Sequence, residues 1–260
     1  MHDLLPLNWL TGSAPDALAF LLSAGLVGVY YLNMRRHVLA DPGYSIHGVN
    51  ALARRLWVEN VMTQPGKDVM AVQTLRNFIM VGIMMASTAS LLIMGTLTLS
   101  GQAESITRNW HILGLYGSHS PELWIFKVLC LLADFLVAFF AYAMSMRLAT
   151  HVLFMLNVPW AESNRHAGLS PEAVASRLIR AGNMVAIGMR AFLFAIPLVF
   201  WLFGPAFLVL ATLGLIATLY HLDRHEAADS GALLPEAAGA RNGQEKEPGQ
   251  PLAFPRPKTA

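Results

Sequence analysis

The feature that most limits the possible folds of this chain is a set of four long apolar stretches. They cover about residues 17–33, 78–99, 123–146 and 191–220. A helix needs about 20 apolar residues to cross a bilayer core of about 30 Å, and the last three stretches reach that length. Only 13% of the residues are charged, against about 25% in soluble domains. The sequence therefore predicts an all-α, polytopic integral membrane protein with four transmembrane helices.

The stretch over 191–220 allows two interpretations. At 1.5 Å per residue it would be about 45 Å long, which exceeds one perpendicular crossing. Pro197 and the pair Gly204-Pro205 interrupt it. One interpretation is a single tilted and kinked helix, and the other is a helical hairpin that turns at Gly204-Pro205. Because each arm of a hairpin would have only about 15 apolar residues, we expect the single kinked helix, with proline as the cause of the kink.

Basic residues are distributed unevenly between the apolar stretches. Residues 33–76 contain six Lys and Arg and residues 147–190 contain five, whereas residues 1–16 contain none. The positive-inside rule places the two basic segments in the cytoplasm. We therefore expect a multi-pass protein of the cell inner (plasma) membrane, with its N-terminus outside and, after four spans, its C-terminus outside as well. A transmembrane domain over 1–225 would be followed by a disordered tail over 226–260, which is rich in Ala, Gly, Pro, Glu and Gln.

The two basic segments also carry helical patterns. Residues 48–62 alternate apolar and basic side chains, as in an amphipathic helix on a membrane surface. Asp68 is a candidate capping residue for a helix that runs into the second stretch. Ser170-Pro171-Glu172 combines a capping residue, a first-turn proline and an early acid, and it predicts a helix that leads into the fourth stretch. Helical extensions on the cytoplasmic side are therefore expected.

Asp134 lies near the middle of the third apolar stretch. A carboxylate there costs a few kcal/mol or more, so its default interpretation is functional. Small or polar residues share its helix face: Lys127, Cys130, Ala138, Ala141 and Ser145. We expect this face to pack inside the bundle, against a stripe of Asn77, Met84, Thr88 and Gly95 and another of Gly25 and Gly28. Asp134 would then serve an ion, proton or polar-solute path, or be a neutral or hydrogen-bonded structural acid.

Candidate metal ligands are few. His221 and His225 are spaced i, i+4 and are weak candidates, since no His-Glu-x-x-His motif accompanies them. The single cysteine, Cys130, excludes an internal disulfide and a thiolate cluster within one chain. No phosphate-binding glycine loop and no serine nucleophile motif occurs. The net charge of +2 does not indicate nucleic-acid binding. No cofactor is therefore expected.

Several short motifs follow one another in a specific order. They are Val72-Gln73-Thr74-Leu75-Arg76-Asn77, then Ala138-Phe139-Phe140, Ser145-Met146-Arg147 and His151, and finally Gly188-Met189-Arg190 and Trp201-Leu202-Phe203-Gly204-Pro205. Between about Gly28 and Asp223 the chain resembles the bacterial and plant membrane-protein family called domain of unknown function 599. The resemblance implies a four-span fold and no established activity. It draws attention to polar residues expected to cluster on the cytoplasmic side: Gln73, Arg76, Asn77, Arg147, His151 and Arg190.

The function favoured at this level is that of a non-enzymatic integral membrane protein. It would be either a conduit for a small solute or ion, or an accessory subunit of a membrane complex. A conduit would need a homo-oligomer, because the chain is small and has no detectable internal repeat. The alternative is a membrane-embedded metal-dependent or lipid-modifying enzyme. The expected partners are the lipid bilayer and either further copies of the chain or another membrane protein, and not nucleic acid.

Overall fold

Within the residues that the structure describes, all regular elements are helical. The computed structural model describes residues 7–40, 46–102, 121–163 and 165–232. Its long helices are α1 (Leu7–Ala40), α3 (Asp68–Gly101), α5 (Pro121–Leu156), α7 (Pro171–Phe203) and α8 (Pro205–Ala232). The shorter elements are α2 (Ile46–Thr63), α6 (Trp160–Ser163) and a 3-10 turn (Ala167–Leu169). The predicted all-α fold class is confirmed.

Four helices contain segments that are long and apolar enough to cross a membrane. These segments are Ala14–Met34, Asp68–Gly101, Glu122–Leu156 and Pro171–Phe203. A fifth apolar segment, Pro205–His221, is shorter. Many large apolar side chains on these helices are exposed, among them Leu91 at 73% and Met94 at 65%, as is required of surfaces that face lipid. The chain is therefore a polytopic helical membrane protein.

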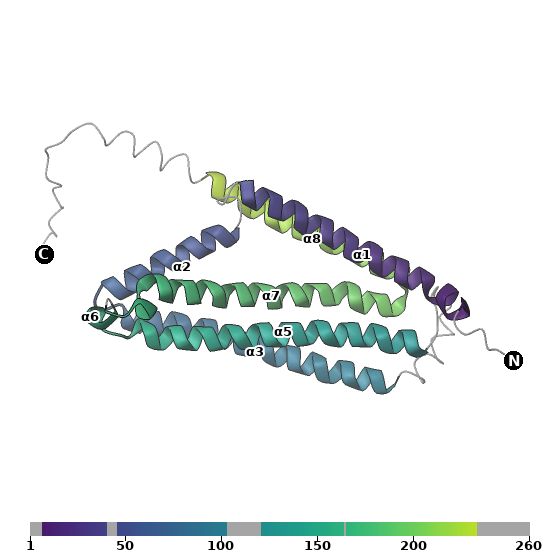
Figure 1. Ribbon diagram of the computed structural model, residues 1–260, viewed down its shortest axis with the longest axis horizontal. Coiled ribbons are helices and arrows are strands. Elements are labelled where there is room, and N and C mark those ends of the chain that lie inside the picture. The colour runs from purple at the N-terminus through teal and green to yellow at the C-terminus, as the bar shows by residue number, and fades with distance from the viewer. Residues whose placement is uncertain (1–6, 41–45, 103–120, 164, 233–260) are drawn as a thin grey trace, which may run out of the picture.

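The helices form a layer of three and a separate pair. In Figure 1, α3, α5 and α7 lie side by side, while α1 and α8 run together at an angle to this layer. α5 is the central helix of the layer. Ala138 and Tyr142 on it pack with Ala86 and Ala89 of α3 on one side and with Ala191 of α7 on the other. Alanines at these positions allow the backbones to approach closely, which is how membrane helices associate.

The expectation of one kinked helix over 191–220 is wrong. α7 ends at Phe203, and α8 begins at Pro205 and runs back along the molecule (Figure 1). Gly204 joins them at φ 149° and ψ 163°, a conformation that favours glycine. Pro205 suits the first turn of α8, where its missing N–H is no loss. The hairpin is possible because α7 starts at Pro171, far before the apolar stretch, and α8 continues to Ala232, beyond its end. Neither arm therefore depends on the apolar residues alone.

This hairpin gives the molecule two distinct ends. We call the end with the turn at Gly204 the hairpin end, and the end where α2 lies the basic end. α1 starts at the hairpin end, whereas α8 finishes at the basic end (Figure 1). The expectation that both termini lie outside assumed four crossings, and α8 adds a fifth pass along the molecule. α8 also remains helical through Ala232, beyond the boundary at 226 expected for the tail. The rest of that tail lies outside the described residues.

Of the three local helix signals in the sequence, the structure confirms the cap at Ser170 and the helix over 48–62, but not a cap at Asp68. Ser170 caps α7, because its Oγ accepts a hydrogen bond from the backbone N–H of Ala173 at 3.3 Å. The predicted helix over 48–62 is also present, and Val58 and Val61 bury one face of it against α7. Asp68 is not a cap: Lys67 is the N-cap residue of α3, without a side-chain hydrogen bond, and Asp68 lies in the first turn. There its charge suits the positive end of the helix dipole.

The predicted inner face of α5 is confirmed, but the predicted stripes on α3 and α1 are wrong. Lys127, Ala138, Ala141 and Ser145 are all buried. On α3, by contrast, Asn77, Met84, Thr88 and Gly95 are exposed, and the buried stripe consists of Ala71, Leu75, Gly82, Ala86, Ala89 and Thr96. Gly25 and Gly28 of α1 have no neighbour within 4 Å of a built Cβ position. α3 and α1 therefore do not meet α5 in one core through these stripes.

Candidate functional site

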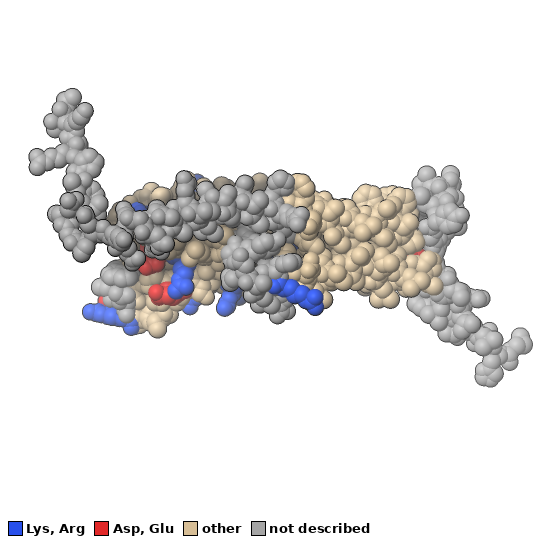
Figure 2. Space-filling model, turned by 90° about the horizontal axis from the view of Figure 1, so that it is seen from above, with Lys and Arg blue, Asp and Glu red and all other residues tan. Residues whose placement is uncertain are grey.

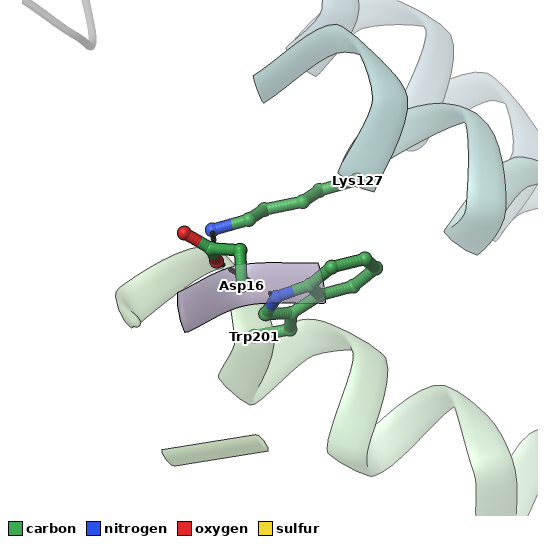
Figure 3. Close-up of polar contacts among 3 residues, drawn as sticks. All are labelled: Asp16, Lys127 and Trp201. Carbon is green, nitrogen blue, oxygen red and sulfur yellow. Dashed lines mark hydrogen bonds and ion pairs between the residues drawn. The ribbon is translucent and has the colours of Figure 1, made fainter. Parts of the chain in front are cut away.

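A buried ion pair joins the two groups of helices at the hairpin end. Asp16 of α1 and Lys127 of α5 lie 2.6 Å apart between Oδ1 and Nζ. The same Oδ1 accepts a hydrogen bond of 3.0 Å from the indole Nε1–H of Trp201, near the end of α7 (Figure 3). Asp16 is 0% and Lys127 4% exposed. Three helices that are far apart in sequence are thus fixed to one another through a single oxygen atom.

The surroundings of this ion pair are aromatic. Phe20 of α1 stacks on the Trp201 ring, with the centroids 5.1 Å apart. Phe126 meets the same ring edge-on at 6.2 Å. The Lys127 ammonium lies 5.4 Å from the centroid of the Trp201 ring, within the range of a cation–π interaction. Removing either ion alone would leave the other buried and unpaired, which is strongly destabilising. The cluster therefore acts as a polar latch between α1, α5 and α7.

A cavity of about 510 Å³ lies beside the latch. Asp16, Phe20, Phe126 and Trp201 line it together with Glu122, which is exposed. The Oδ2 atom of Asp16 is buried and makes no hydrogen bond within the described part of the chain. In Figure 3 this second oxygen points away from Trp201. The cavity thus combines a largely apolar wall with two carboxyl groups.

Asp134 does not take part in this cluster. Its side chain is half-buried on α5, and its Oδ2 makes no hydrogen bond to any described residue. About three helical turns toward the basic end, Ser145 donates a hydrogen bond of 2.8 Å to the carbonyl of Ala181 on α7. The hydroxyl of Tyr142, on the same helix, is buried and likewise lacks a partner among the described residues. α5 therefore carries several polar groups along its length, and of these Lys127 is paired with Asp16 and Ser145 with the Ala181 carbonyl.

The six polar residues singled out by the family motifs are spread over three helices. Gln73, Arg76 and Asn77 are exposed on α3, and Arg147 and His151 are exposed on α5. Arg190 is half-buried on α7, with its guanidinium carbon 5.5 Å from the centroid of the Tyr31 ring on α1.

Arg190 also lies at a different depth from Arg147. A Cβ built on Gly188 would lie 2.7 Å from the Tyr142 ring, and Ala191 packs with Ala138. Arg190 is therefore level with residues 138–142 of α5, about 10 Å from Arg147 along the helix axes at 1.5 Å per residue. The other five residues are near the basic end, and Arg190 is nearer the middle of the bundle.

At the basic end, Arg54 connects α2 to α7. Its guanidinium lies directly over Gly182, where any Cβ atom would collide with it. Burial lowers the pKa of the Arg54 guanidinium from its ordinary value. Val58 and Val61 continue the same contact toward Val174 and Leu178. Because Gly182 has no side chain, the Arg54 guanidinium of α2 can lie directly against the α7 backbone.

The candidate metal ligands do not form a site within the described residues. His221 is exposed on α8, and the side chain of His225 lies outside the described residues. No group of three or more His, Cys, Asp and Glu side chains is close enough to hold a metal ion in the part of the chain that the structure covers.

Sequence reasoning missed Asp16 and the role of Trp201. Asp16 stands just before the first apolar stretch, at the end of the N-terminal flank. A usable signal was present: in a helical membrane protein, consecutive spans alternate in direction, so the start of the first and the start of the third lie at the same end. Asp16 and Lys127 occupy those positions with opposite charge. Trp201 belongs to a recognised motif, but its hydrogen bond depends on the turn at Gly204.

The comparisons with known proteins give a family but no activity. Neither the curated proteins nor the solved structures include a match to this chain. A family model described as "Protein of unknown function, DUF599" matches residues 18–228. The match includes the long helices α3, α5 and α7 and most of α1 and α8, and it leaves Asp16 just outside. The chain therefore belongs to the DUF599 family.

Proposed function

We propose that the protein is a non-enzymatic conduit for a small solute or ion in the cell inner (plasma) membrane. The observation that carries this proposal is the difference between the two ends of the molecule. At the hairpin end the Asp16–Lys127–Trp201 latch fixes α1 to α5 and α7. Toward the basic end the α1–α8 pair and α7 diverge, with α2 between them (Figure 1). Such an arrangement is closed on one side of the membrane and can open on the other.

A second cavity supports the same interpretation. It has a volume of about 410 Å³ and lies between α7 and α8, with Leu193, Phe200, Phe207 and Ala211 among its lining residues. Thr218 lines it on the side toward the basic end. Transporters commonly bind their substrates between two helical groups that move against each other. The angled α1–α8 pair and the α3–α5–α7 layer are two such groups.

The orientation follows from the distribution of charge. Figure 2 shows Lys and Arg gathered over one half of the visible face, while the other half is almost free of them. The ends of α1 and α5, the starts of α3 and α7, and all of α2 lie at the basic end. The positive-inside rule then places this end in the cytoplasm. With α8 as a fifth crossing, the N-terminus would lie outside and the end of α8 inside.

Thiol labelling tests the conduit. In a Cys130→Ala background, Ala211→Cys places a thiol in the cavity between α7 and α8, and Leu91→Cys places a matched thiol on the exposed face of α3. We expect a membrane-impermeant thiol reagent to modify Ala211→Cys from the cytoplasmic side only. Adding Asp16→Asn with Lys127→Met, which removes both charges of the latch, should allow modification from the outside.

The labelling rates decide between the outcomes. If Ala211→Cys reacts no faster than Leu91→Cys from either side, the cavity is filled by lipid and the conduit is refuted. If it reacts from the cytoplasm, but the latch variant adds no outside labelling, the latch is not the outer gate.

The exposed polar residues at the basic end favour a second function, that of an accessory subunit. Gln73, Arg76 and Asn77 on α3 and Arg147 and His151 on α5 present side chains to the surroundings near the expected cytoplasmic boundary. Such residues can bind an acidic partner or lipid headgroups. Co-purification from native membranes of a partner that is lost in an Arg76→Ala, Arg147→Ala variant would support this function. Recovery of the chain only as a homo-oligomer would contradict it.

A further inference from the structure

We infer that the cavity at the hairpin end is a binding site for a lipophilic organic cation, such as one with a quaternary ammonium or phosphonium centre. This inference does not depend on conduction, because a binding site at this place would exist in a conduit and in an accessory subunit alike. It rests on three features of the cavity: its charge, its aromatic wall and its size.

The charges of the site favour a cation. Among the described residues, two carboxyl groups line the cavity, those of Asp16 and Glu122. The Lys127 ammonium lies beside it and bonds to Oδ1 of Asp16. Oδ2 of Asp16 is buried and without a hydrogen-bond partner among the described residues. A buried carboxylate oxygen of this kind is costly unless something compensates it. A cation in the cavity would supply that compensation.

The wall of the cavity suits a cation that cannot donate hydrogen bonds. Phe20, Phe126 and Trp201 all line it, and aromatic rings attract quaternary ammonium groups through their negative faces. Trp201 already holds one cation in this way, the Lys127 ammonium at 5.4 Å. Among the described residues, the polar side-chain groups that line the cavity are the two carboxyl groups and the indole N–H of Trp201, which already bonds to Asp16. A quaternary centre, which makes no hydrogen bonds, suits such a lining. A strongly hydrated inorganic ion would lose much of its hydration on entering.

The size of the cavity favours a cation with several apolar groups. At about 510 Å³ it falls within the range of small-molecule sites, about 300–1,000 Å³. Leu21 and Leu123 add apolar surface to the aromatic wall. The exposed side chain of Glu122 also lines the cavity, so a ligand can reach it from outside the bundle.

Equilibrium dialysis with two ions of matched shape and opposite charge tests the inference. The full chain in an uncharged maltoside detergent is dialysed against radiolabelled tetraphenylphosphonium or tetraphenylborate, and binding to empty micelles is subtracted. We expect saturable binding of one tetraphenylphosphonium per chain and no saturable binding of tetraphenylborate. Asp16→Asn should weaken the binding about tenfold, since it removes the nearest charge. Phe126→Leu should weaken it about fivefold, through the lost cation–π contact.

Two further variants complete the test. Phe140→Leu changes an exposed phenylalanine on the same helix, far from the cavity, and should bind as the unaltered chain does. Glu122→Gln changes an exposed carboxylate and should have a smaller effect than Asp16→Asn. If Asp16→Asn fails to fold, as judged by size-exclusion chromatography, Phe126→Leu and Glu122→Gln decide the question. Equal binding of both ions, or saturable cation binding that none of these three variants weakens, overturns the inference.

Discussion

Within the described structure, α5 and α7 form the most extensive helix contact, and Gly188 of α7 faces the Tyr142 ring of α5 inside it. We therefore expect a larger side chain at position 188 to lower the stability of the protein. A Cβ atom on Gly188 would lie 2.7 Å from Cζ, 2.8 Å from Cε2 and 3.0 Å from Cδ2 of Tyr142. These three atoms belong to one rigid ring. The ring is 0% exposed and packs against Phe192, with the centroids 5.6 Å apart, so it cannot move aside without disturbing the core.

The magnitude for Gly188→Ala follows from two opposing terms. Replacing glycine by alanine within a helix stabilises it by about 1 kcal/mol, whereas overpacking a tight core costs about 1–3 kcal/mol. We expect a net loss of about 1 kcal/mol. Gly214→Ala is the matched control, because its built Cβ has no neighbour within 4 Å, and it should leave stability unchanged or raise it by up to about 1 kcal/mol. Reversible unfolding in mixed detergent and dodecyl sulfate micelles measures both free energies.

A second variant isolates the contact itself. Tyr142→Leu removes the ring atoms that Cβ would meet, so Gly188→Ala in that background should lose its penalty. The coupling free energy between the two substitutions is then about 1 kcal/mol or more. Equal stability of Gly188→Ala and Gly214→Ala, together with zero coupling to Tyr142, would refute the packing argument.

Two further predictions concern the latch and the start of α7. Lys127→Met should lower the free energy of unfolding by about 3–5 kcal/mol, because it leaves the buried Asp16 carboxylate unpaired. Adding Asp16→Asn should recover most of this loss in the same unfolding assay. If the double variant is no more stable than Lys127→Met, the ion pair is not the cause. Ser170→Ala should lower the free energy of unfolding by about 1 kcal/mol through loss of the helix cap. Ser170→Asp can still accept the hydrogen bond from Ala173, so it should lower the free energy of unfolding by less. Equal losses in the two variants would show that the hydroxyl does not cap α7 in solution.

The parts of the fold that sequence reasoning predicted are those set by local composition. Apolar stretches with few charges identify membrane helices, because every uncompensated charge in hydrocarbon is costly. The start of α7 was also predictable, since Ser170, Pro171 and Glu172 act within one helical turn. The inward face of α5 followed from residue spacing alone, because small side chains are needed wherever helix backbones approach each other.

The hairpin and the latch were not predicted, for a related physical reason. Each arm of the hairpin has too few apolar residues for a full span, but α7 extends from Pro171 through Arg177 and Arg180 before its apolar part begins. The latch depends on that hairpin indirectly, since Trp201 lies three residues before Gly204 and reaches Asp16 from the last turn of α7. Because α1 packs against α8, the turn at Gly204 that brings α8 back along the molecule also brings Asp16 to Trp201.

Asp16 and Asp134, two acids within the described membrane helices, show that the position of an acid in the sequence indicates its role less well than its position in the helix bundle. Asp134 stands in the middle of an apolar stretch and attracts attention, yet it remains half-buried on α5. Asp16 stands at the edge of a stretch, and it is fully buried with a cation at 2.6 Å. A charge near the end of a span costs less to place in the membrane than one at its centre, so it can be combined with a second charge from another helix at moderate cost. Because an ion pair at a helix end can separate and re-form as the helices move, Asp16 is a better candidate for a gate than Asp134.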